Sequence, residues 1–133
     1  MDSNEKFLFW FDLAQYDLDT AESMLISKRW LYVVFMCQQA VEKLVKGIYV
    51  LYLGDNVPRT HNIRVIFEKY EDQLSEKIDE RYIDLFEDLT IHYINGRYVD
   101  YKQKLSDRLD ENASTEILRQ TREVFAWLMT MKR

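Results

Sequence analysis

Apolar residues recur along this chain at the spacing of amphipathic α-helices. Near the N-terminus they follow steps of three and four residues, which keeps them on one face of a helix. This pattern predicts a first helix from about Glu5 to Ser27. Its stripe, widened by Trp10 and Leu13, consists of Phe7, Phe11, Ala14, Leu18, Ala21 and Leu25. A second helix is predicted from about Trp30 to Leu53, and the short connection makes the two helices antiparallel neighbours.

Turn signals separate the next two predicted helices. The segment GDNVPR, Gly54 to Arg59, places a glycine near a helix end and a proline beyond it, which predicts a loop. Thr60 or Asn62 then caps a short third helix that ends near Tyr70. A fourth helix is predicted from about Glu76 to Ile94, where an Asn-Gly pair stops it. Its stripe consists of Ile78, Tyr82, Leu85, Leu89 and His92.

The C-terminal part begins with a stretch that the pattern does not resolve. Residues 97–112 are compatible with a loop, an extended segment or a helical turn. A last helix is predicted to begin near Ser114 or Thr115. Its stripe consists of Ile117, Thr121, Val124, Leu128 and Met131. The chain therefore predicts an all-α fold, an up-and-down bundle of four or five helices that forms one domain over residues 1–133.

Composition supports one folded domain and excludes other classes. With 47% hydrophobic and 31% charged residues, the chain is neither intrinsically disordered nor an integral membrane protein. We find no signal peptide and no run of membrane-spanning length, so we expect a cytoplasmic protein without membrane contacts. The net charge is −5, and residues 68–88 alone hold nine acidic and three basic residues. Bulk charge therefore neither indicates nor excludes nucleic-acid binding.

The single cysteine and one of the two histidines have structural interpretations. Cys37 cannot form an internal disulfide, and its place in the apolar second helix predicts a small buried side chain. The cysteine offers no metal-ligand spacing, and we expect no cofactor. His92 lies on the apolar stripe of the fourth helix, which favours a core or interface histidine over a catalytic one.

The second predicted helix combines an apolar row with an ordered polar row. Gln39, Glu42 and Lys46 recur at steps of three and four residues, with Lys43 one turn beyond Gln39. The adjoining row, which suits a buried face, consists of Val34, Val41, Val45 and Ile48. In one interpretation the lysines contact phosphates while Gln39 and Glu42 read a base or ribose. In the other, Asp17 of the first helix pairs with Lys43 or Lys46 in a semi-buried network that fixes helix register.

A second polar cluster follows the proline-containing loop. Arg59, Thr60 and His61 precede the third helix, and Arg64 lies one turn later. Two arginines, a hydroxyl and free backbone N–H groups at a helix start suit an anion such as phosphate. The alternative is that Thr60 caps the helix and His61 hydrogen-bonds back to the bundle. Further along, Arg97 lies among tyrosines that suit stacking on a base or contact with a second subunit.

Several motifs, in chain order, resemble the HEPN domain family. The pattern W…A..DL..A of the first helix is formed by Trp10, Ala14, Asp17, Leu18 and Ala21. QQAVEKLVK at residues 38–46, RTH at 59–61 and RY at 97–98 follow. The resemblance implies a helical bundle that commonly dimerises. It also implies a role in nucleotide binding, in pairing with a minimal nucleotidyltransferase, or in RNA cleavage as a toxin.

Ribonuclease members of the family resemble one another in an arginine followed, after four to six residues, by a histidine. This pair lets a cation hold a phosphate while an imidazole transfers a proton. Here Arg59 stands only two residues before His61. His92 has Arg81 eleven residues before it and Arg97 five residues after it, which is the reverse order. The spacing typical of the ribonucleases is therefore missing from this sequence.

We therefore expect a non-catalytic, nucleotide- or phosphate-binding domain. The resemblance implies that it forms a homodimer, partners a minimal nucleotidyltransferase, and takes a nucleotide or RNA as ligand. The candidate ligand-binding residues are Gln39, Glu42, Lys43, Lys46, Arg59, Thr60, His61, Arg64 and Arg97. Two alternatives stay open: a HEPN ribonuclease or toxin with a non-standard site at His61 or His92, and a purely structural helical interaction protein.

Overall fold

The computed structural model describes residues 1–133 and consists of helices joined by loops and one short 3-10 turn. The elements are α1 (Ser3–Ile26), α2 (Trp30–Leu53), α3 (Ile63–Glu68), η1 (Glu71–Gln73), α4 (Glu80–Asn95), α5 (Val99–Arg108) and α6 (Glu111–Met129). The all-α prediction is confirmed, with six α-helices where four or five were expected. None of the helices combines the length and the apolar character that a membrane crossing requires.

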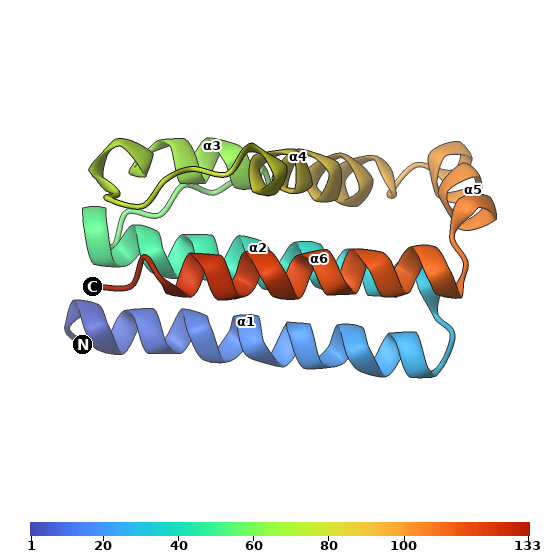
Figure 1. Cartoon of the computed structure of the whole chain (residues 1–133), viewed down its shortest axis with the longest axis horizontal. Coiled ribbons are helices and arrows are strands. Elements are labelled where there is room, and N and C mark those ends of the chain that lie inside the picture. The colour runs from blue at the N-terminus through green and yellow to red at the C-terminus, as the bar shows by residue number, and fades with distance from the viewer.

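α2 forms the centre of the bundle. α1 runs beside it, α6 lies along both, and α3 and α4 cover the other side (Figure 1). α5 lies at one end of the molecule, while the two chain termini lie together at the opposite end. Because α2 has neighbours on several sides, half of its 24 residues are buried. A polar residue on α2 therefore needs partners from the surrounding helices.

A glycine lets α1 and α2 approach closely. A Cβ atom on Gly47 would stand 2.9 Å from the Cβ of Trp10, which is shorter than a normal contact. Ala14 and Ala21 continue the line of small residues on α1, and both are fully buried. This close packing brings Trp10 of α1 beside Lys46 of α2, whose Nζ lies 6.0 Å from the centroid of the indole ring.

The N-terminal half of the bundle follows the predictions closely. α2 has the predicted bounds, and α1 begins two residues and ends one residue earlier than expected. Asn62 caps α3, since its Oδ1 accepts the N–H of Val65 at 3.3 Å. Thr60, the other candidate cap, instead accepts the N–H of Asn62 at 3.1 Å and shapes the turn before the helix.

In the C-terminal half, aspartate caps shift the start of two helices. α4 begins four residues later than expected because Asp79 caps it, accepting the N–H of Arg81 at 2.9 Å. α6 begins at least three residues earlier than expected because Asp110 caps it, accepting the N–H of Ala113 at 2.8 Å. The segment that the sequence pattern left unresolved contains α5.

Candidate ligand-binding site

The polar row of α2 contains an almost completely buried carboxylate. Glu42 is only 3% exposed and has three polar partners. Gln38 Nε2 and Lys46 Nζ donate to its oxygens at 2.9 and 3.0 Å, and His61 Nδ1 lies 2.9 Å from Oε1. Burying a carboxylate without such partners costs several kcal/mol, and these three contacts compensate for that cost. Glu42 therefore holds its neighbouring side chains in place and has little exposed surface for contact with a ligand.

His61 is held at two points and still faces solvent. A carboxylate can only accept a hydrogen bond, so the Nδ1 that faces Glu42 carries a proton. The backbone oxygen of His61 accepts a second bond from Gln38 Nε2 at 3.1 Å. The side chain is nevertheless 46% exposed, and its Nε2 has no hydrogen-bond partner within the chain. The prediction that His61 hydrogen-bonds back to the bundle is confirmed, and this contact orients the ring without covering it.

Tyr93 of α4 extends the site beyond the loop. Its ring centroid lies 5.1 Å from that of His61, and the Arg97 guanidinium carbon lies 5.4 Å from the same ring. Phe35 packs edge-on against Tyr93 at 5.9 Å and supports it from α2. Arg97 is exposed and has no carboxylate partner. The imidazole of His61 and the guanidinium of Arg97, which has no ion-pair partner, therefore both pack against the ring of Tyr93.

The second carboxylate of the site pairs with a different lysine. Asp17 of α1 forms an ion pair with Lys43 of α2, and both side chains are mostly covered. This confirms the predicted bridge between α1 and α2, with Lys43 as the partner and Lys46 committed to Glu42. Gln39 Nε2 donates to Gln38 Oε1 at 2.8 Å and continues the network to the surface.

Arg64 does not join the other predicted anion-binding residues. Its guanidinium pairs with Glu68 one turn ahead, at 2.8 Å, and with Glu87 of α4. These two acids, through their hydrogen bonds, raise the pKa of Arg64 above its ordinary value. Arg64 therefore links α3 to α4. Arg59, by contrast, is exposed and has no ion-pair partner.

Gln38 belongs to the candidate site but is missing from the residues predicted from the sequence. It is fully buried and donates both to Glu42 and to the backbone of His61. Its spacing of four residues from Glu42 was the available signal, since residues i and i+4 share a helix face. The predicted polar row contained Gln39, which is half-buried, whereas the residue that contacts Glu42 is the fully buried Gln38.

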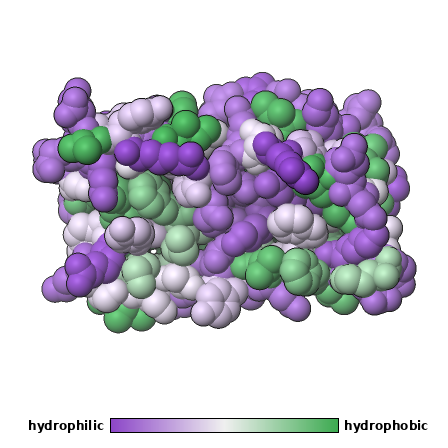
Figure 2. Space-filling view, turned by 180° about the vertical axis from the view of Figure 1, so that it is seen from behind, coloured by the Kyte–Doolittle hydropathy of each residue, from purple (hydrophilic) through white to green (hydrophobic).

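The candidate residues carry more positive than negative charge. Four cations, Lys43, Lys46, Arg59 and Arg97, accompany the two carboxylates of Asp17 and Glu42. α2 lies behind α6 in Figure 1, so Figure 2 shows the molecule from the side of α2. Hydrophilic residues cross the middle of this face, with hydrophobic patches on both sides of them (Figure 2). The face can thus offer charge to an anion and apolar contact to a second group.

The other reactive groups of the chain have structural positions. Cys37 is fully buried, and this burial raises the pKa of its thiol to about 11, as expected for an unreactive cysteine. His92 is half-buried, and its Nδ1 lies 2.7 Å from the Tyr101 hydroxyl of α5. Burial, assisted by the charge of Arg108, lowers the pKa of His92. His92 therefore connects α4 to α5 and takes no part in the site around Glu42.

Fold and site together define an all-α bundle in which a buried carboxylate orients a solvent-facing histidine beside an uncommitted arginine. The model of the HEPN domain matches residues 7–132, and the chain belongs to this family. The family resemblance of the sequence motifs is thereby confirmed. No curated protein and no solved structure matches the chain.

Proposed function

We propose that this protein is a non-catalytic HEPN domain that binds a nucleotide or another phosphate ligand, forms a homodimer and partners a minimal nucleotidyltransferase. Membership of the family supports a nucleotide-binding or RNase-like helical domain. The observation that carries the binding proposal is the placement of His61. Its ring is hydrogen-bonded to Glu42, packs against Tyr93 at a tilt of 56° and is exposed to solvent, and Arg97 packs on the same tyrosine.

The phosphate contacts are assigned to the cations that have no acidic partner. Lys43 and Lys46 are neutralised by Asp17 and Glu42, so little of their charge is available to a ligand. Arg59 and Arg97 are exposed and unpaired, and a guanidinium can form two parallel hydrogen bonds to a phosphate. We therefore assign these two arginines to the phosphates and the lysines mainly to holding the helices together.

His61 contributes through Nε2. In the neutral ring this nitrogen accepts a hydrogen bond, which suits a ribose hydroxyl. In the protonated ring it donates, which suits a phosphate oxygen. Either contact requires the ring orientation that Glu42 and the backbone bond from Gln38 impose.

RNA cleavage at the same site is a second candidate because of the Glu42–His61 contact. A carboxylate that orients an imidazole is an arrangement used for general-base catalysis. The arginine spacing of the ribonuclease members is missing around His61, which favours binding over cleavage. If a mixed RNA substrate is degraded by the purified protein and this activity disappears in His61→Ala, the catalytic candidate replaces the non-catalytic one.

Ligand binding is tested by thermal shift and calorimetry with ATP, GTP, their monophosphates and inorganic tripolyphosphate. A ligand at ten times its Kd should stabilise the fold by about 1.4 kcal/mol. We expect Arg97→Ala to weaken binding about tenfold, since it removes a charge-assisted contact to phosphate. Arg81→Ala, on the other end of α4, is the matched control and should bind like wild type. The proposal fails if no ligand binds, or if the two variants lose affinity equally.

A further inference from the structure

A mostly apolar pocket opens next to the polar site, at the end of the bundle that carries the chain termini. It has a volume of about 340 Å³, within the range of about 300–1,000 Å³ that is usual for small-molecule pockets. Phe9 and Trp10 of α1 line one side, and Val50 and Val57 line the other. A phosphate group does not bind to an apolar surface. A ligand group that occupies this pocket would therefore be apolar.

Trp10 joins this pocket to the polar site. Its indole lines the pocket and also lies under the Lys46 ammonium, 6.0 Å from ring centroid to Nζ. The same Nζ lies 3.0 Å from Glu42 Oε2, and Glu42 Oε1 lies 2.9 Å from His61 Nδ1. A chain of side-chain contacts along α2, through Lys46 and the buried carboxylate, therefore links the pocket to the histidine. A ligand held at both ends must carry an anionic group and an apolar, stackable group.

The pocket has the features of a site for an aromatic ring. Phe9 is 57% exposed, and its ring meets that of Trp10 nearly at right angles, at 80° and 6.5 Å. Nucleobases stack on such rings with little dependence on base identity. At the rim, Lys6 and Asp55 form an ion pair whose polar atoms can meet the edge of a base. A few polar groups on an apolar wall are the usual composition of a small-molecule pocket.

We infer that this pocket is the nucleobase subsite of the ligand whose phosphates Arg97 and His61 hold, with Trp10 as the residue that selects for a base. The inference rests on the proposed function, because it needs a phosphate anchored at His61 and Arg97.

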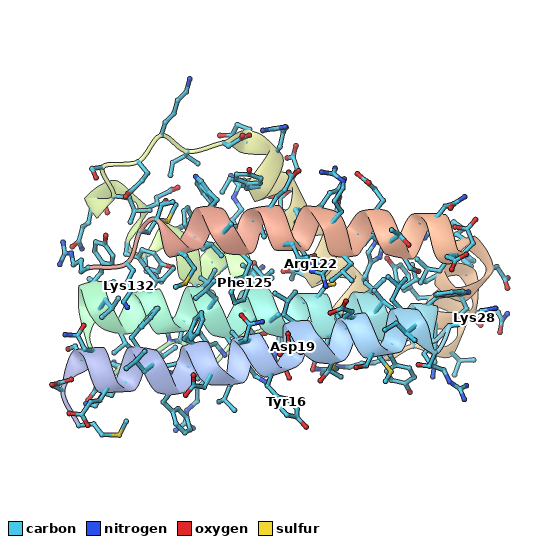
Figure 3. The ribbon with its side chains drawn as sticks, turned by 60° about the horizontal axis from the view of Figure 1, so that its bottom comes forward. Tyr16, Asp19, Lys28, Arg122, Phe125 and Lys132 are labelled. Atoms are coloured by element: carbon cyan, nitrogen blue, oxygen red, sulfur yellow. The ribbon has the colours of Figure 1, made fainter.

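The test compares ATP with inorganic tripolyphosphate, which has the same phosphates and no base. Wild type should prefer ATP by about tenfold, and Trp10→Leu should abolish this preference while leaving tripolyphosphate binding unchanged. Trp10→Phe, which keeps an aromatic face, should retain most of the preference. Tyr16→Leu is the matched control, since Tyr16 projects from α1 away from the bundle (Figure 3) and should leave both affinities unchanged.

Because Trp10 packs on Gly47, Trp10→Leu could disturb the fold, and a second variant of the pocket separates that effect from loss of the subsite. Phe9→Ala removes an exposed ring of the pocket and should also lower the preference for ATP. The subsite is refuted if wild type shows no preference for ATP, or if the preference survives Trp10→Leu. It is also refuted if Trp10→Leu weakens ATP and tripolyphosphate equally. Failure of wild type to bind either compound would instead refute the phosphate site itself, so the two failures are distinguishable.

Discussion

Glu42 shows how one residue can serve the fold and the site together. Its carboxylate lies inside the bundle, and its partners come from α2 itself and from the loop that carries His61. The bond to His61 sets the ring, and the bond to Lys46 neutralises the charge. The structural and functional interpretations of the polar row are therefore compatible at this residue, since the contacts that hold the helices also aim the histidine.

We expect Glu42→Gln to destabilise the fold by about 2 kcal/mol. The amide keeps the shape, but Lys46, whose side chain is only 12% exposed, loses its counter-charge. Removing one partner of a covered ion pair costs up to about 3–5 kcal/mol, and partial access to solvent reduces this. Urea unfolding measures the change, with Asp17→Asn at the more exposed pair as the comparison. If Asp17→Asn costs as much as Glu42→Gln, then Glu42 has no special role in anchoring the site.

At the scale of elements, the helices with the most apolar residues were predicted most accurately from the sequence. α2 was predicted to the residue because apolar positions run along its whole length. α5 was not resolved because Leu105 is its one buried residue, too few to create a period. Long-range pairing was equally hidden: that Glu87, 23 positions away, would neutralise Arg64 cannot be read from local spacing. The helix that carries the site was predictable, whereas the partners of its side chains were only partly so.

The attachment of α5 to α4 should depend on pH through His92. Burial lowers the pKa of His92 below the ordinary value of 6.5, so the unfolded chain takes up a proton more readily than the folded one. Stability is then fully present above pH 6.5 and falls as the pH drops below it. His92→Gln should reduce the difference in free energy of unfolding between pH 7.0 and pH 5.5, measured by urea titration. An unchanged difference would show that His92 does not carry this pH dependence.

At the scale of the whole molecule, apolar side chains remain uncovered near Arg97. Ile91 and Ile94 on α4 are 48% and 39% exposed, and Tyr98 and Val99 at the start of α5 are 67% and 81% exposed. Clustered exposed apolar residues mark contact surfaces more often than isolated ones do. A second copy that covers this end of α4 would bring its own Arg97 near the first, so that dimerisation and ligand binding become linked. The proposed homodimer therefore has a candidate surface beside the candidate site.

Oligomeric state in solution tests this arrangement. We expect light scattering to give about twice the chain mass of 16.2 kDa for wild type, and Val99→Glu to shift the protein toward the monomer. Val99 is so exposed that a carboxylate there costs the isolated chain little, whereas between two subunits it would have to be desolvated. Tyr16→Glu places the same charge on a similarly exposed apolar position of α1 and should remain dimeric. A monomeric wild type with intact helicity would contradict the homodimer, and a dimer that only Tyr16→Glu disrupts would move the interface to α1.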